Sequence, residues 1–125
     1  MELSQNIFNK LNLKLCMSNR EPNFLVDDII ESANKILEYT QDLSYEEFTK
    51  DSKTIDAVIR NFEIIGEAAN RLPEHFKEKY PNIDWHRIRG FRNRIVHDYF
   101  GIDYSIVWEI KLSFLLNLII SLKSL

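Results

Sequence analysis

The stretch SKTIDAVIRNFEIIGEAANR, residues 52–71, decides the fold of this chain. Apolar side chains recur in it every three or four residues, the spacing that places them on one face of an α-helix. Pro73 predicts the end of this long helix, because proline disrupts a helix interior. Gly66 costs the helix about 1 kcal/mol relative to alanine, so we expect another helix to approach closely there. The predicted core stripe is Ile55, Val58, Ile59, Phe62, Ile65 and Ala69.

Capping residues and the same apolar spacing predict five further helical segments. Asn23 is expected to cap a helix with a buried face over residues 25–37. Ser44 and Glu47 match the capping box that opens a short helix. The other three are expected over residues 73–80, from Asp84 to a stop at Gly101 with Gly90 as a candidate interruption, and from Asp103 to about Lys123. The chain is therefore predicted to be all-α, with four main helices plus short ones.

Length and composition indicate a single globular domain. The chain has 125 residues, 45% of them apolar, and its three glycines and three prolines are too few for a turn-rich β fold. Pro22 separates an N-terminal extension over residues 1–22, predicted to be helical, from a bundle domain over residues 23–125. The single cysteine, Cys16, predicts a reducing, cytoplasmic location. The apolar run over residues 114–122 is shorter than the roughly 20 residues that a membrane span requires, so no membrane partner is expected.

The last predicted helix is apolar on more than one stripe. A helix that is apolar on most sides is expected to be buried on most sides. One face would then pack on the core, and the other would need a cover. An ordinary core helix, a cover from the N-terminal extension and a cover from a second subunit all remain open.

A compact cluster of positive charge stands out in a chain of net charge −3. Residues 85–97 contain four arginines and two histidines but no acid. Such a cationic cluster in an acidic protein is expected to meet a phosphate group. Arginine keeps its charge and grips two phosphoryl oxygens at once, whereas histidine transfers protons near neutral pH. Arg92 and His97 are therefore the candidate reactive pair of an RNA-cleaving site.

Helical geometry would place these residues on different stripes. If the run were one continuous helix, Arg92 and Tyr99 would share a stripe, while Asn93 and His97, four residues apart, would be neighbours on another. Arg92 and His97 would not share a face. Their convergence would then need a distorted turn, the length of the arginine side chain or a second copy of the chain.

The run RNRIVHDY, residues 92–99, resembles the signature of the HEPN superfamily, and its Arg-Asn-three residues-His-X-Tyr form is similar to the HepT branch. Further resemblance lies in residues 56–61, 64–69 and 81–85, in Gly90, and in residues 99–101 and 107–108. It extends from about Asn23 to about Trp108. Asp84 departs from it, since this branch usually shows proline before the tryptophan.

The resemblance implies a HEPN-like helical bundle that acts as a metal-independent endoribonuclease and as a two-fold homodimer. It implies Arg92 and His97 as catalytic residues and Asn93 as a supporting polar residue. It further implies the toxin half of a toxin–antitoxin pair. The cognate minimal nucleotidyltransferase would attach AMP to Tyr99 and silence the toxin.

Simpler interpretations remain open beside this one. Arg89 and Arg94 are candidate RNA contacts, but a solvated basic face is equally compatible with their positions. The spacing of His75, His86 and His97 indicates no metal site, because Pro81 interrupts any continuous helix, and no cofactor is predicted. The alternative function is a non-catalytic helical partner, or substrate-binding subunit, of a nucleotidyltransferase.

Overall fold

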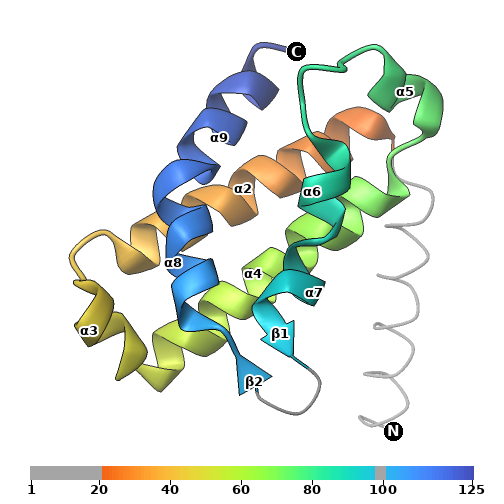
Figure 1. The fold of residues 1–125 in the computed structure, drawn as a ribbon. Coiled ribbons are helices and arrows are strands. Elements are labelled where there is room, and N and C mark those ends of the chain that lie inside the picture. Colours follow the sequence, from red (N-terminus) through yellow and green to blue (C-terminus); the bar gives the residue numbers. More distant parts are fainter. Residues whose placement is uncertain (1–20, 98–100) are drawn as a thin grey trace, which may run out of the picture.

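The computed structural model describes residues 21–97 and 101–125, and for Arg92, Val96, His97 and Ile102 it describes the backbone. Helices dominate the described chain, so the all-α prediction is confirmed (Figure 1). Residues 1–20, most of the predicted N-terminal extension, lie outside the described residues. The elements are α2 (Pro22–Thr40), α3 (Tyr45–Thr49), α4 (Ser52–Arg71), α5 (Glu74–Glu78), α6 (Trp85–Arg89), α7 (Phe91–Ile95), β1 (Val96–His97), β2 (Gly101–Ile102), α8 (Tyr104–Ser113) and α9 (Leu115–Lys123).

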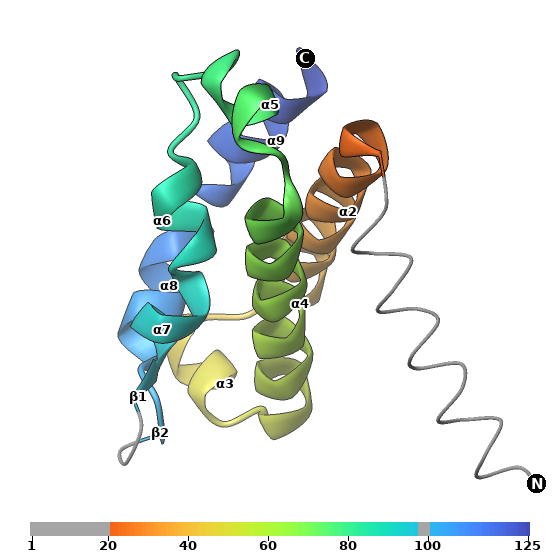
Figure 2. The same cartoon turned by 90° about the vertical axis from the view of Figure 1, so that its right-hand side faces the viewer.

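The long helix α4 is the centre of the bundle. Figure 2 shows it between α2 on one side and α6 with α7 on the other, and α9 packs on α2. All of its predicted stripe is buried except Ile59, which is half-buried. Each large apolar side chain removed from water stabilises the fold by roughly 1.5–3 kcal/mol. The largest fully buried side chains are Phe48, Phe62, Phe91, Leu25, Ile29, Ile36, Ile65, Ile88, Ile95, Ile110, Leu115 and Val58.

The predicted close approach at Gly66 is confirmed, and the neighbour is α6. A Cβ atom at Gly66 would lie 3.5 Å from the carbonyl oxygen of Arg89 and 3.6 Å from that of Ile88. Both are ordinary van der Waals distances. The backbone of α6 therefore rests directly on α4, which sets the position of the residues that follow it.

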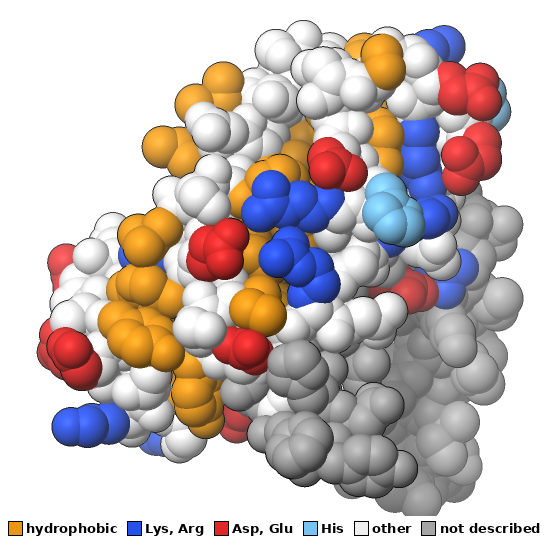
Figure 3. Space-filling view, in the orientation of Figure 1, with side chains coloured by type: hydrophobic (Ala, Val, Ile, Leu, Met, Phe, Trp, Pro, Cys, Tyr) orange, Lys and Arg blue, Asp and Glu red, His pale blue; other side chains and the backbone are white. Residues whose placement is uncertain are grey.

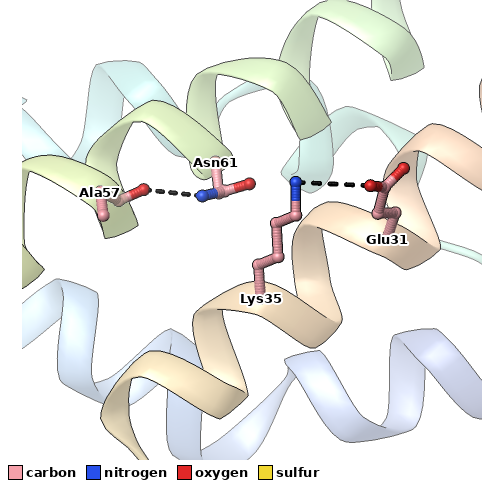
Figure 4. A network of polar contacts seen from close by, with 4 residues as sticks. All are labelled: Glu31, Lys35, Ala57 and Asn61. Carbon is pink, nitrogen blue, oxygen red and sulfur yellow. Dashed lines mark hydrogen bonds and ion pairs between the residues drawn. The ribbon is translucent and has the colours of Figure 1, made fainter.

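Polar groups also lie along the contact between α2 and α4. Asn61 is buried, and its Nδ2 donates to the carbonyl oxygen of Ala57 one turn earlier at 2.8 Å. On α2, Lys35 Nζ pairs with Glu31 Oε1 at 3.3 Å. Figure 4 shows Lys35 extending from α2 toward Asn61 on α4. The hydrogen bond to Ala57 offsets the cost of burying the Asn61 amide.

Three of the predicted caps are confirmed and one is wrong. The capping box is present, since Ser44 accepts from the Glu47 amide and Glu47 accepts from the Ser44 amide. Asp84 accepts from the Arg87 amide, and Asp103 accepts from the Ile106 amide. Asn23 is not a cap, because α2 begins at Pro22, whose fixed φ suits the first turn of a helix.

The last predicted helix is broken into two. Its axis bends by 42° between α8 and α9, at Phe114, where φ is −124°. The Ser113 hydroxyl donates to the Glu109 carbonyl at 2.7 Å, a bond that bends helices. Among the described residues no single helix is long and apolar enough to cross a membrane, although α8 and α9 taken together pass that test of length and composition.

Two faces of α8–α9 are apolar, as predicted, but one of them is exposed in the single chain. Leu115, Leu118, Ile119 and Leu122 are buried in the core. On the other side Leu112 is 65% exposed, Leu116 58% and Ile120 60%. Figure 3 shows hydrophobic side chains along this edge of the molecule.

The candidate interruption at Gly90 is confirmed, since α6 ends at Arg89 and α7 begins at Phe91, but the predicted stop at Gly101 is wrong. The helix ends at Ile95, and β1 and β2 then pair antiparallel, with Val96 opposite Ile102 and His97 opposite Gly101. The physical reason is the Ile95 carbonyl, which accepts from the Asp103 amide at 2.7 Å. This long-range bond joins the end of α7 to the residue that follows β2. Gly101 lies in β2 with a φ of +79°, a conformation that favours glycine.

Candidate functional site

The helix α7 is fixed to the core by Phe91 and Ile95, which are four residues apart and fully buried. The Phe91 ring meets Phe62 of α4 and Phe114 of the α8–α9 break edge-to-face, with centroids 5.4 Å away in each case. Such aromatic pairs contribute roughly 0.5–1.5 kcal/mol beyond the burial of their surface. Asn93 and Arg94, on other sides of α7, are exposed. The core thus fixes the backbone that carries the predicted site.

A groove of about 510 Å³ lies between one face of α4 and the helices α6 and α7. Two residues predicted from the sequence, Arg89 and Asn93, line it together. They are four residues apart, on either side of the α6 C-cap Gly90. Arg94 is exposed but does not line the groove. The other described lining residues come from α4, and they are Arg60, Glu63, Ile64, Gly66, Glu67 and Asn70.

The charges around the groove are mixed. Arg60 and Arg89, from opposite sides, are exposed and positive, whereas Glu63 and Glu67 bring negative charge from α4. Glu67 is paired with Arg71 one turn later, with 2.6 Å between Oε1 and Nη2. Part of the acidic charge is therefore neutralised within α4. An anion in this groove would be held locally, by the arginines.

The backbones of Arg92 and His97 belong to different elements. Arg92 lies in α7, and His97 lies in β1 after the helix has ended. In a continuous helix the two would have been about 140° apart around the axis. The expected helical neighbours Asn93 and His97 are likewise no longer on one helix, so the sequence-based stripes do not apply. Tyr99 lies outside the described residues, in the connection between β1 and β2.

The comparisons with known proteins identify the family of the chain. A family model described as "Ribonuclease HepT-like" matches residues 29–124. The chain belongs to the HepT-like ribonuclease family. Its sequence is 46% identical over 94 residues to "Putative RNase MJ1380" of Methanocaldococcus jannaschii, a match that covers 75% of this chain and 86% of that protein. The predicted resemblance is thereby confirmed.

Two further relatives carry similar names. "Putative RNase MJ0127" of the same organism is 41% identical over 97 residues, covering 78% of this chain and 80% of the relative. "Probable ribonuclease HepT" of Thermococcus cleftensis is 40% identical over 84 residues, covering 67% of this chain and 76% of the relative. No solved structure matches the chain.

One arginine of the basic cluster, Arg87, packs inside this HepT-like chain instead of lining the groove. The guanidinium carbon of Arg87 lies 4.3 Å from the centroid of the Phe114 ring, at the break between α8 and α9. Its Nε is buried and has no hydrogen-bond partner within residues 21–97 and 101–125. Arg87 therefore packs against an aromatic ring, whereas Arg89, two residues later, is exposed and lines the groove. The basic cluster is not one uniform surface.

Sequence reasoning missed the contribution of α4 to the groove. Arg60, Glu63, Glu67 and Asn70 are spaced by three or four residues, so they form one polar face of the helix. This spacing alone indicates a polar helix face that could line a site. The position of that face beside α6 depends on tertiary packing at Gly66, which the sequence does not show directly.

A metal centre has no support among residues 21–97 and 101–125. No group of three or more histidine, cysteine, aspartate or glutamate side chains in these ranges is placed to hold a metal ion. His75 and His86 are both exposed and lie on different helices.

Proposed function

We propose that this HepT-like chain is a metal-independent endoribonuclease toxin in which Arg92 and His97 are catalytic and Asn93 supports them. The observation that carries the proposal is the groove beside α7. Asn93 of the Arg-Asn pair lines it, together with Arg60 and Arg89. His97 follows two residues after α7 ends, where the chain reverses. Membership of a ribonuclease family supports RNA as the substrate.

The proposed chemistry is an internal transesterification of RNA. The 2′-oxygen attacks the adjacent phosphorus, the bond from phosphorus to the 5′-oxygen breaks, and a 2′,3′-cyclic phosphate and a 5′-hydroxyl result. The proton of the 2′-hydroxyl must be removed, and the leaving 5′-oxygen must receive one. His97 suits proton transfer, and the permanent charge of Arg92 suits the extra negative charge on the phosphoryl oxygens.

A homodimer forms part of the proposal for a chemical reason. One imidazole cannot remove and deliver a proton at the same instant. A two-fold dimer with both motifs at one cleft would supply a second His97. Two identical subunits related by a two-fold axis are also the commonest assembly of soluble proteins.

Neutralisation is proposed to occur at Tyr99 by a cognate minimal nucleotidyltransferase. AMP on this tyrosine would add an anionic phosphodiester two residues from His97. That group would compete with RNA for Arg92 and block entry. Co-expression with a cognate minimal nucleotidyltransferase is expected to add one AMP increment per subunit to the intact mass, and Tyr99→Phe is expected to abolish it. An AMP increment that persists in Tyr99→Phe would show that AMP is attached to another residue.

The activity is tested with purified protein and cellular RNA in EDTA. We expect the wild type to degrade the RNA, and we expect Arg92→Ala and His97→Ala to leave it intact. Lys50→Ala, an exposed change outside the groove, serves as the control for handling and fold. Intact RNA with the wild type, together with tight binding of the nucleotidyltransferase, would instead support the non-catalytic partner.

A further inference from the structure

A second hollow, of about 300 Å³, lies between α5 and α6. Its lining includes two basic residues, Lys77 and Arg89, and one histidine, His86. Figure 3 shows basic side chains and a histidine gathered beside α6. Arg89 lines both this hollow and the groove next to Asn93, so the two hollows adjoin.

Lys77 is the unusual residue of this hollow. Its side chain is only 6% exposed, and its buried Nζ has no hydrogen-bond partner among the residues that the structure describes. An ammonium group carries three donors, and burying them unsatisfied is costly. The partner within reach is Glu74 Oε1 at 3.5 Å, on a side chain that is 76% exposed. Such an exposed, loosely placed carboxylate offsets little of the cost.

The other lining groups do not satisfy the donors of the Lys77 ammonium. Trp85 Nε1 already donates to the Tyr80 carbonyl oxygen at 3.2 Å, so it does not compete. His86 and Arg89 are exposed and add donors at the rim. Glu74 and Glu78 bring negative charge, which lowers the affinity of the hollow for an anion. They do not accept a hydrogen bond from Lys77 Nζ.

We propose that the hollow of Lys77, His86 and Arg89 is a phosphate subsite that holds a backbone phosphate of RNA next to the scissile one. A phosphate group offers several strong acceptor oxygens and negative charge. The oxygens would accept hydrogen bonds from the Lys77 ammonium, and the negative charge would pair with its positive charge. Arg89 joins this subsite to the groove, so one strand contacts both. The inference rests on the proposed ribonuclease function and adds to it a second point of RNA contact.

The first experiment uses inorganic phosphate and the full-length protein, without RNA. Phosphate is titrated while the backbone amides of Lys77 and His86 are followed by NMR. We expect saturable shifts in the wild type, about ten-fold weaker phosphate affinity in Lys77→Met, and recovery in Lys77→Arg. Glu74→Gln is expected to tighten phosphate binding, because it removes the competing carboxylate. Absence of shifts in the wild type, or equal affinity in Lys77→Met, would overturn the subsite.

The second experiment measures RNA affinity against salt in the cleavage-inactive His97→Ala background. Adding Lys77→Met is expected to weaken binding of an oligoribonucleotide about ten-fold and to reduce the salt slope by about 0.7, the loss of one phosphate contact. The matched control is Lys79→Met, which removes the same charge from an exposed lysine two residues away. Equal effects of the two substitutions would overturn the subsite and indicate general electrostatics.

The two experiments separate failure of the subsite from failure of the ribonuclease. RNA cleavage by a wild type that shows no phosphate shifts would reject the subsite alone. Lys77-dependent phosphate binding by a protein that neither binds nor cleaves RNA would reject both the proposed function and RNA as the source of the phosphate.

Discussion

At the scale of single residues, Arg87 and Arg89 show how two arginines of one basic cluster differ. Arg87 lies over the Phe114 ring, a contact worth roughly 0.5–1 kcal/mol, whereas Arg89 is exposed at both hollows. We predict that Arg87→Met lowers the melting temperature by a few degrees at most and leaves the RNA cleavage rate unchanged. Arg89→Met is predicted to leave the melting temperature unchanged and to weaken RNA binding about ten-fold. Thermal melts and RNA titrations measure both, and the reverse pattern would refute the assignment.

At the scale of elements, the contact between α4 and α6 positions the groove. Alanine at Gly66 would place its Cβ at ordinary contact distances from the α6 carbonyls. We predict that Gly66→Ala raises the free energy of unfolding by up to about 1 kcal/mol and keeps RNA cleavage intact. Gly66→Leu is predicted to displace α6, with loss of both stability and cleavage. Urea unfolding measures the stability. A strongly destabilised Gly66→Ala would show that α4 and α6 lie too close together to admit a Cβ atom at Gly66.

The start of α4 gives a pH-dependent prediction. Hydrogen bonds from the side chain and then the backbone amide of Thr54 hold the pKa of Asp51 below its ordinary value. A lowered folded-state pKa contributes stability above the ordinary aspartate pKa, and that stability is lost as pH falls through the lowered value. Asp51→Ala is therefore predicted to lower the melting temperature at pH 7, and the deficit should shrink in acid. Ser52→Ala, at the next residue, is the control. A deficit that is independent of pH would contradict the cap.

The elements also show which features a sequence pattern predicts. The bounds of α4 follow from a dense local repeat of apolar residues, together with Pro73 after the helix. The end of α7 at Ile95 does not follow from a local sequence pattern, because it depends on a hydrogen bond to Asp103, eight residues away. The same holds for the groove, since the polar face of α4 acquires neighbours only when α6 packs at Gly66. Local periodicity thus predicts helices, whereas the site depends on contacts between them.

At the scale of the whole molecule, the proposed dimer predicts that one inactive subunit impairs its partner. The wild type is expected to sediment as a dimer, and the His97→Ala homodimer is expected to be inactive. When the wild type and His97→Ala are co-expressed, each mixed dimer keeps both arginines but a single His97 at the shared cleft. We predict cleavage by the purified mixed dimer far below half that of the wild-type dimer, because one imidazole cannot both remove and deliver a proton. A monomeric wild type, or a mixed dimer with half the wild-type activity, would refute the shared cleft.

The proposed chemistry is tested most directly by typing the ends of the RNA that the purified chain cleaves in EDTA. An end-labelled oligoribonucleotide is compared with its all-2′-deoxy counterpart, for the wild type and for His97→Ala. We predict 2′,3′-cyclic phosphate and 5′-hydroxyl ends from RNA, no cleavage of the deoxy strand, and a rate about 10²–10⁴-fold lower in His97→Ala. Cleavage of the deoxy strand, or an unchanged rate in His97→Ala, would contradict a 2′-hydroxyl mechanism that depends on this histidine.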